Sequence, residues 1–128
     1  MHLKKEDVPV RLAAPGATAR QLPDFGNASG TLGAEYFSLA AGTDIAPLLV
    51  GLTADLCHSA HWGYLIVGRL VVTYRDGSTE HLAGGELFFW PSGHTVRVEQ
   101  DAELVMFSPQ REHGEVLDHM SRAMASTA

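Results

Sequence analysis

The sequence predicts a single all-β domain, an antiparallel sandwich or barrel, that ends in one helix. Short apolar stretches separated by Gly-rich turns run through most of the chain, which is typical of antiparallel sheets rather than of alternating strands and helices. A helical period is present only in the last twenty residues. The 128 residues are 45% apolar and 19% charged, which is enough for one globular core without disulfides.

The strands are predicted from apolar runs bounded by polar or glycine residues. Residues 1–33, where Pro, Gly, Ala and Asn are frequent, should form an N-terminal arm with one strand at Thr18–Leu22. Residues 34–108 should form the barrel. The dipeptide Asp76-Gly77 predicts a two-residue hairpin turn, because both positions tolerate positive φ. The barrel strands are expected at Glu35–Leu39, Pro47–Leu52, Trp62–Val67, Leu70–Tyr74, Ser78–Leu82, Glu86–Trp90, Thr95–Val98 and Glu103–Ser108.

Residues 109–128 should form the C-terminal helix and tail. Their apolar residues recur at helical spacing, which gives the helix one apolar face. We expect this face to cover an open end or edge of the barrel. A contact between the two copies of a homodimer is the alternative. The apolar positions are Val116, Leu117, Met120, Ala123 and Met124.

Composition limits the partners and the compartment. Nine Lys and Arg stand against fifteen Asp and Glu, a formal charge of −6, without a basic run. Nucleic acids and anionic membrane surfaces are therefore not expected partners. Cys57 is the only cysteine, so no internal disulfide can form. Because the chain has neither a signal-like N-terminus nor an apolar run of about 18 residues, we expect a cytoplasmic protein.

Two segments resemble the motifs of the cupin family. Trp62-Gly-Tyr-Leu-Ile-Val-Gly68-Arg-Leu-Val-Val is similar to the end of the first motif, and Leu82-Ala-Gly-Gly-Glu-Leu-Phe-Phe-Trp-Pro-Ser-Gly-His94 is similar to the turn between the motifs and the start of the second. The resemblance covers roughly residues 34–108. It implies a small single-domain cupin, whose jelly-roll barrel usually holds a metal with three histidines and one glutamate.

The chain departs from this family pattern at the ligand positions. His61 stands where a typical cupin has its glutamate, Cys57 where it has its second histidine, and Asp55 where it has its first. Val96 stands at the histidine position of the second motif, and His94 lies two residues earlier. The resemblance therefore implies Cys57, His61 and His94 as metal ligands, with Asp55 as a candidate fourth.

Strand alternation supports the same choice. If the segment is extended, Asp55, Cys57, Ser59 and His61 share one face and His58 points the other way. If it is a turn, His58 can replace Cys57 as a ligand. A cysteine with two histidines suits zinc best, and iron or nickel also fit.

Three further residues are candidates for the lining of the pocket. Ser59 lies between Cys57 and His61, Val96 shares a face with His94, and Tyr36 has a polar group for a ligand. The remaining histidines are expected at the surface, and they are His2, His81, His113 and His119.

The prediction for function is a homodimeric barrel that holds a divalent transition metal and binds a small organic molecule, as a candidate metal-dependent enzyme of unknown reaction. No hydrolase, dinucleotide-binding or P-loop motif is present. The alternative is a binding module without metal or catalysis, in which the same residues form the polar floor of the pocket.

Overall fold

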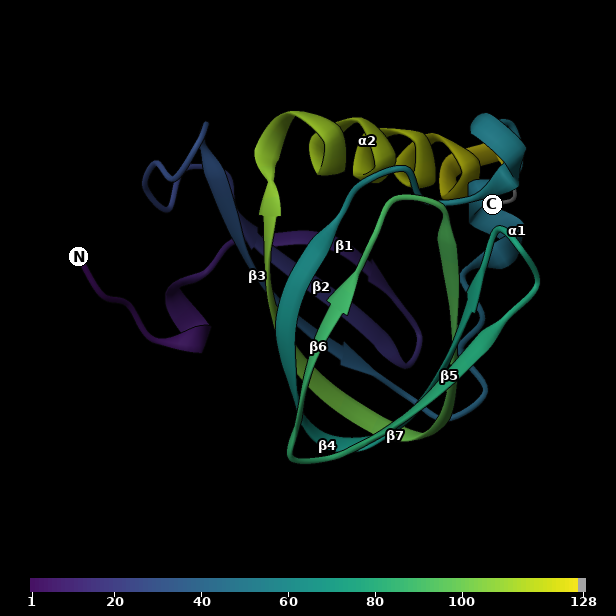
Figure 1. The fold of residues 1–128 in the computed structure, drawn as a ribbon. Helices are drawn as coiled ribbons and strands as arrows, with labels where there is room; N and C mark the ends of the chain where they lie inside the picture. The colour runs from purple at the N-terminus through teal and green to yellow at the C-terminus, as the bar shows by residue number, and fades with distance from the viewer. Residues whose placement is uncertain (127–128) are drawn as a thin grey trace.

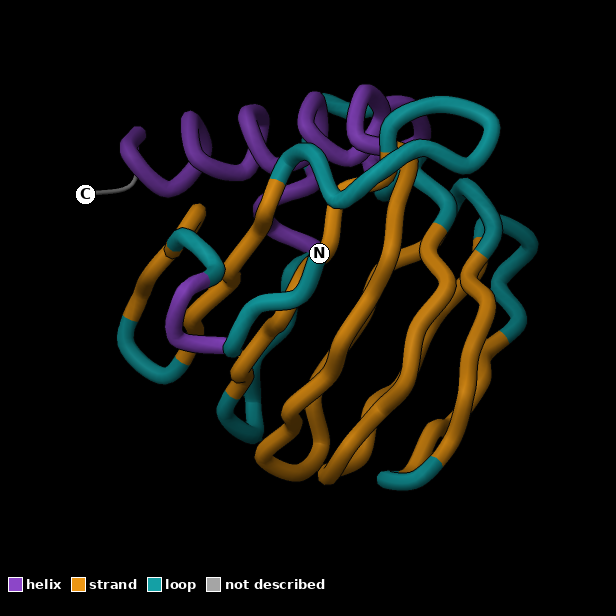
Figure 2. The backbone as a smooth tube through the Cα atoms, turned by 90° about the vertical axis from the view of Figure 1, so that its left-hand side faces the viewer, coloured by secondary structure: helices purple, strands orange, loops and turns teal. Residues whose placement is uncertain are grey.

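The computed structural model describes residues 1–126 and contains one antiparallel sheet that curls around a core. The sheet has seven strands in the order β1-β2-β3-β7-β4-β5, and β6 pairs with β4. Figures 1 and 2 show these strands side by side with the C-terminal helix lying across one end of the barrel. The predicted fold class is confirmed. The strands are β1 (Val10–Ala14), β2 (Ala17–Leu22), β3 (Leu32–Leu39), β4 (His61–Tyr74), β5 (Thr79–Ala83), β6 (Glu86–Trp90) and β7 (His94–Pro109).

Two long strands replace four of the expected short ones. Trp62–Val67 and Leu70–Tyr74 are the two halves of β4, and Thr95–Val98 and Glu103–Ser108 are parts of β7. The pairing register of β4 with β7 shifts around Gly68, which has a φ of 102°. This is a bulge, and it bends the strand without ending it. The two long paired strands form one wall of the barrel, and each carries one histidine of the candidate site at its start.

The predicted strand at Pro47–Leu52 is wrong, because this segment contains the short helix α1 (Ala46–Leu49). Proline fits the first turn of a helix, where its missing N–H is not needed. The Oδ1 atom of Asp44 accepts a hydrogen bond from the N–H group of Ala46, the first residue of the helix, at 2.9 Å. Leu49 is fully buried below the C-terminal helix.

The N-terminal arm contains two strands instead of the one expected. The expected strand lies within β2, and β1 pairs with it through a turn at Gly16, which has a φ of 76°. β2 also pairs with β3, so that Gln21 faces Glu35. Residues 10–22 therefore extend the main sheet. The run at Val10–Ala14 alternates too weakly to predict β1, which depends on pairing with its neighbour.

The helix α2 (Gln110–Ser126) closes one end of the barrel, in agreement with the first of the two expectations for it. Val116, Leu117 and Met120 are buried and pack with Leu49 and Cys57 in a cluster between the helix and the sheet. A second cluster fills the barrel below. The end of the predicted tail, residues 127–128, lies outside the described residues. Within residues 1–126 no helix has the length and apolarity to span a membrane.

The bulge at Gly68 should be sensitive to substitution. A Cβ atom there would lie 2.3 Å from the Asp101 carbonyl oxygen, in addition to the strain of the positive φ. Gly68→Ala should lower the free energy of unfolding by about 3 kcal/mol, measured by urea denaturation. Gly77→Ala is the matched control, because Gly77 has a φ of 86° but open space around it, and it should lose about 1 kcal/mol. Equal losses would show that the close approach at Gly68 has no effect.

Candidate metal centre

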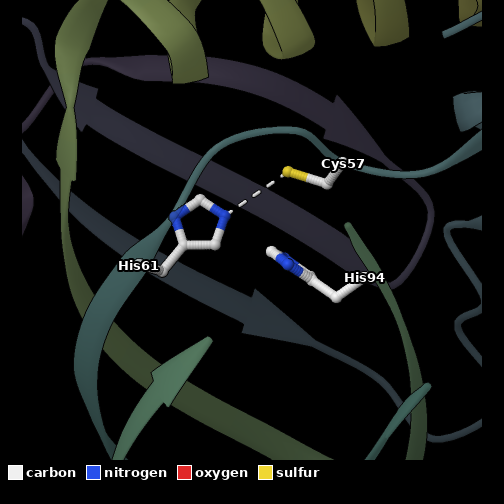
Figure 3. Close-up of side chains that lie close together, drawn as sticks. All are labelled: Cys57, His61 and His94. Carbon is white, nitrogen blue, oxygen red and sulfur yellow. Dashed lines mark hydrogen bonds between the residues drawn. The ribbon is translucent and has the colours of Figure 1, made fainter. Parts of the chain in front are cut away.

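Three buried side chains, Cys57, His61 and His94, meet at one point inside the barrel (Figure 3). Their Sγ and ring nitrogen atoms lie within 4.8 Å of one another, and each residue is at most 2% exposed. His61 begins β4 and His94 begins β7. Cys57 is attached to His94 by its backbone, because the Cys57 N–H group donates to the His94 carbonyl oxygen at 2.9 Å. The three predicted ligands are thus brought together from three separate segments.

Both histidines are held in the form that binds a metal through Nε2. The Nδ1–H group of His94 donates to the Pro91 carbonyl oxygen at 2.8 Å. The Nδ1–H group of His61 donates to Ser108 Oγ at 2.6 Å, and Ser108 in turn donates to Glu35 Oε1 at 2.5 Å. Each Nε2 atom therefore carries a lone pair. Fixing one ring nitrogen by a hydrogen bond is the usual way in which proteins orient a histidine ligand.

Burial sets the protonation of the three groups in the metal-free protein. Burial lowers the pKa of His61 well below its ordinary value, and the nearby His113 and His94 lower it further. Burial also lowers the pKa of His94 to about 4, although its bond to Pro91 opposes the shift. The pKa of Cys57 is raised to about 12, chiefly by burial. At neutral pH both imidazoles are therefore neutral and able to bind a metal, whereas the thiol must lose its proton when a metal binds.

The distance between the sulfur donor and one nitrogen donor matches that in a tetrahedral metal site. Cys57 Sγ lies 3.5 Å from His61 Nε2. With ordinary Zn–S and Zn–N bond lengths and a tetrahedral angle, these two atoms would be about 3.6 Å apart. Without a metal, the same contact is a hydrogen bond from the thiol to the imidazole. The residues present therefore fit a metal held by one sulfur and two nitrogen atoms.

The structure does not bring Asp55 or His58 to this centre. Ala54 and Asp55 have φ angles of 57° and 58°, so the chain turns there and the alternation of an extended strand does not apply. Asp55 is exposed, and its Oδ1 atom accepts a hydrogen bond from the Gly51 N–H group at 3.0 Å. His58 points toward α2, where its Nε2 atom lies 3.1 Å from Glu115 Oε2.

Of the three residues expected to line a pocket, only Val96 does so. Ser59 is fully buried, but its hydroxyl donates to the Ala60 carbonyl oxygen at 3.0 Å. Tyr36 lies on the outside of the sheet, with the Lys5 Nζ atom 4.6 Å from its ring centroid. The reason is strand alternation, because β3 directs the neighbouring Glu35 inward.

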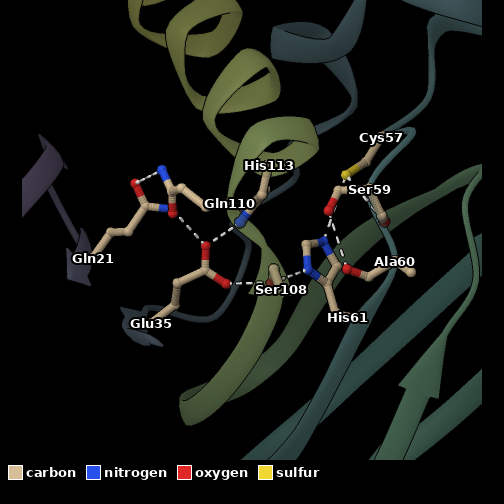
Figure 4. A network of polar contacts seen from close by, with 9 residues as sticks. All are labelled: Gln21, Glu35, Cys57, Ser59, Ala60, His61, Ser108, Gln110 and His113. Carbon is tan, nitrogen blue, oxygen red and sulfur yellow. Dashed lines mark hydrogen bonds and ion pairs between the residues drawn. The ribbon is translucent and has the colours of Figure 1, made fainter. Parts of the chain in front are cut away.

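A buried polar network behind His61 was not predicted from the sequence (Figure 4). The carboxylate of Glu35 accepts hydrogen bonds from Gln21 Nε2 at 2.8 Å, from Ser108 Oγ and from His113 Nδ1. His113 is 3% exposed, so its expected surface position is wrong. Its spacing from Val116 and Leu117 places it on the apolar face of α2, and that spacing could have revealed it. Gln110 Nε2 extends the network to Gln21 at 3.5 Å.

A cavity of about 430 Å³ opens beside the three candidate ligands. All seven strands except β5 line it, together with α1 and α2. Its volume is in the range of pockets that hold small organic molecules. Cys57, His61, His94 and His113 all contribute to its wall. The rest of the wall is mainly apolar and includes Leu12, Phe37, Ile45, Leu104, Val116 and Met120.

Solved structures with the same architecture were found, although no protein family matches the chain and no curated protein matches it in sequence. An RmlC-like cupin from Shewanella frigidimarina has a TM-score of 0.59 and 20% identity over 87% of this chain and 92% of its own. The polyketide cyclase RemF from Streptomyces resistomycificus has a TM-score of 0.58 and 19% identity over 86% and 79%. Oxalate decarboxylase from Bacillus subtilis, which has Mn(II) centres, has a TM-score of 0.56 and 23% identity over 81% and 28%.

The lowered pKa of His94 makes a prediction for the metal-free protein. Unfolded chains take up a proton at this histidine near pH 6.5, but the folded protein resists it until about pH 4. Acid therefore favours unfolding, and the free energy of unfolding should fall by up to about 3 kcal/mol across this range on account of His94. Urea denaturation at several pH values, with a chelator present, measures this fall.

His94→Asn should make the fall in stability with acid less steep in this range, because one of the two buried titrating rings is removed and His61 remains. His119→Asn is the control, since His119 is half-buried outside the cavity wall and its Nε2–H group donates to the Val50 carbonyl oxygen. The control should keep the slope of the original protein. Identical slopes in the original protein and His94→Asn would contradict the prediction.

Proposed function

We propose, from the premise that this chain has the cupin fold, that it binds one divalent transition metal through Cys57, His61 and His94 and takes a small organic molecule into the adjoining cavity. The observation that carries the proposal is the meeting of three buried metal-binding atoms at the wall of an apolar cavity. Their geometry and hydrogen bonds match the needs of a metal. Three protein ligands also leave one position open toward the cavity, as in catalytic rather than structural sites.

Zinc is the metal that we propose. The Mn(II) centres belong to a structural neighbour of low sequence identity, and manganese favours oxygen ligands. The donors here are a thiol and two imidazoles, which suit zinc better, with iron or nickel as the other candidates. When bound, a divalent zinc ion with an open position polarises an oxygen atom of a ligand or lowers the pKa of a bound water.

The ligand that fits this site is an apolar molecule that carries at least one oxygen atom. The mainly apolar wall favours a hydrocarbon or aromatic body, while the metal position favours an oxygen donor. The chain's own part is to exclude water with α2 and to orient the ligand against His61 and His94.

One observation favours the metal-free alternative. The Cys57 thiol already makes a contact of 3.5 Å with His61 Nε2 and lies 3.8 Å from the Ser59 carbonyl oxygen. These contacts satisfy the buried thiol without a metal. In that case the same three side chains form a polar patch that binds the oxygen atom of a ligand by hydrogen bonds. Metal content decides between the two functions.

We also propose that the protein is a homodimer. The apolar face of α2 is buried within the chain, so the dimer contact must lie elsewhere. Five exposed side chains form an outer aromatic face on β4, β6 and β7, in which Trp62 pairs across the strands with both Phe89 and Phe107 and stacks on Phe89 with ring centroids 5.3 Å apart. The members are Trp62, Tyr64, Leu87, Phe89 and Phe107.

The outer aromatic face has the size and chemistry of an interface core. Its members are 38–83% exposed, and none is charged. The exposed parts of its four aromatic side chains amount to roughly 350 Å², close to half of the ~800 Å² that each partner contributes to a standard interface. An uncharged contact also suits two copies that each carry a charge of −6.

A free, buried cysteine is preserved best in a reducing compartment, so we propose that the dimer acts in the cytoplasm.

The metal site is tested by metal content and affinity. Protein purified without an affinity tag or chelator should contain about one zinc ion per chain, measured by plasma mass spectrometry. Cys57→Ser, His61→Gln and His94→Gln should each lower the affinity at least about 100-fold in a competition with a chromogenic chelator, because each removes a ligand. Asp55→Asn and His58→Gln are matched controls beside the site, and both should keep the original affinity.

Two results would oppose this assignment. The absence of metal from all samples, with no change in thermal stability when zinc is added, would reject the metal and leave the metal-free binding module. Loss of metal in Asp55→Asn, with retention in Cys57→Ser, would show that a different set of residues holds the ion.

The homodimer is tested at the outer aromatic face. Leu87→Glu should convert the dimer to a monomer, because a charge at the contact must lose its hydration without a partner. Light scattering after size exclusion measures the mass. Val50→Glu is the control, since Val50 is also exposed, at 62%, but lies beside α1. A monomeric original protein, or a dimer that survives Leu87→Glu, would reject this interface.

A further inference from the structure

The wall of the cavity contains a groove that runs along β2, apart from the metal centre. Strand alternation places Ala19 and Ala17 on the inner side of β2, and both line the cavity. Ala19 pairs across the strands with Leu12 on β1 and with Phe37 on β3, which also line it. The smallest side chain of this row therefore lies between two large ones, and the space above it is a groove.

The groove is closed at one end and open at the other. Gln21, the next inward residue of β2, is 2% exposed, and its side chain donates to Glu35 in the buried polar network. In the other direction lies the turn between β1 and β2, where Ala14 and Pro15 are exposed and still belong to the cavity wall. A ligand can therefore enter beside this turn, but it cannot pass Gln21.

The helix α2 forms the opposite wall of the cavity over a long distance. His113, near the start of the helix, and Met124, near its end, both line the cavity. At 1.5 Å per residue, the helix advances about 16 Å between them. An extended chain of atoms advances about 1.2 Å per atom, so the cavity is long enough for about twelve carbon atoms in line. The flexible side chains of Met120 and Met124 in this wall can adapt to such a chain.

Burial defines the direction in which a ligand lies. Cys57, His61 and His94 are at most 2% exposed, whereas Pro15 and Pro47 in the same wall are exposed. The polar atoms are thus deep in the cavity, and its mouth is mainly apolar. A ligand with an oxygen atom at one end is therefore bound best with that end inside and its apolar end toward the mouth.

We propose that the ligand is an amphiphile with an oxygen-bearing head and an unbranched apolar chain of about twelve carbons, and that the chain lies in the groove over Ala19 and Ala17. Neighbouring strands are about 4.8 Å apart and carbon atoms in contact are about 4 Å apart, so a groove over one strand accepts a single chain better than a compact ring system. Ala19 and Ala17 are then specificity-determining residues, because a larger side chain would occupy the space of the ligand. This inference rests on the proposed function, because the head must lie near Cys57, His61 and His94.

The experiment measures the binding of 1-alkanols, from 1-hexanol to 1-tetradecanol, to the full-length protein in the presence of zinc. A change in tryptophan fluorescence reports binding, because Trp90 lies in the cavity wall. The affinity should rise about threefold to fourfold with each CH2 group that enters the groove. It should level off near 1-dodecanol, because further carbons remain in water. 1-Adamantanol has the ten carbons of 1-decanol in a compact cage and should bind at least about tenfold more weakly, because a cage buries less surface in a groove.

Substitutions in the groove test where the chain lies. Ala19→Leu should lower the affinity for 1-decanol at least about tenfold, because the new side chain fills the groove. Ala17 is about 7 Å nearer to the turn, so Ala17→Leu should lower the affinity for the longer alkanols and keep that for 1-hexanol. Thr18→Leu is the matched control, because Thr18 lies between the two alanines, on the other face of β2 and outside the cavity wall. It should bind the whole series like the original protein, and thermal unfolding establishes that each variant is folded.

Three results would overturn this inference, and they affect the proposed function differently. Equal affinity for 1-decanol and 1-adamantanol would reject the chain and leave a metal centre with a small organic ligand. An affinity that rises with chain length but is unchanged in Ala19→Leu and Ala17→Leu would show that the chain lies on another surface. Failure of every alcohol to bind would also reject the ligand of the proposed function. The zinc affinity should be the same in Ala19→Leu as in the original protein, because Ala19 does not belong to the metal centre.

Discussion

The hydrogen bonds on the two sides of the His61 ring are the constraint on which the site depends. Nδ1 donates to Ser108, and Nε2 faces the thiol of Cys57. The ring belongs to both groups of potential ligands, one with Cys57 and His94 and one with Glu35 and His113. Because its Nδ1 proton is committed to Ser108, only Nε2 can take a metal. The bond to Ser108 therefore directs a metal toward the cysteine side of the ring.

The buried carboxylate of Glu35 ties this constraint to the rest of the fold. A buried polar group is destabilising unless it is hydrogen-bonded. The three donors come from β2, β7 and α2, so the network is complete only when the N-terminal strands and the C-terminal helix are both in place. Elements at the two ends of the chain thus help to hold the ring of His61 in one orientation. A carboxylate satisfied in this way also favours one arrangement of the helix over alternatives.

The helix α2 has two roles, and both depend on the same apolar face. Its apolar face covers the end of the barrel through Val116, Leu117 and Met120, and the same face carries His113 into the cavity wall. The cavity remains hollow because the barrel cluster and the helix cluster are separate, with apolar side chains around a space that neither fills. An apolar, water-poor environment strengthens the electrostatic effects of the few polar groups in it. The fold therefore provides a space for a ligand and an environment that strengthens the effect of the few polar groups in its wall.

The sequence by itself determined the elements whose signals are local. Alternating apolar residues and Gly-rich turns predicted the antiparallel sheet, Asp76-Gly77 predicted the β4–β5 hairpin, and the apolar spacing after residue 109 predicted α2. The resemblance to the cupin motifs, aligned on Gly68 and Gly93, implied Cys57, His61 and His94, which the structure brings together. Local signals failed where a turn replaced a strand, as at Asp55, or where a proline began a helix, as at Pro47.

Only the tertiary structure decided what surrounds these residues. Glu35 and His113 are 78 positions apart, and Ser108 and His61 are 47 positions apart. No periodicity within one segment reports such a contact, because it depends on the register between strands and on where the helix lies against the barrel. The same holds for Tyr36, which strand alternation placed outside once Glu35 was inside. A sequence can show which side chains share a face of one element, but the position of that face relative to others follows from packing the whole chain.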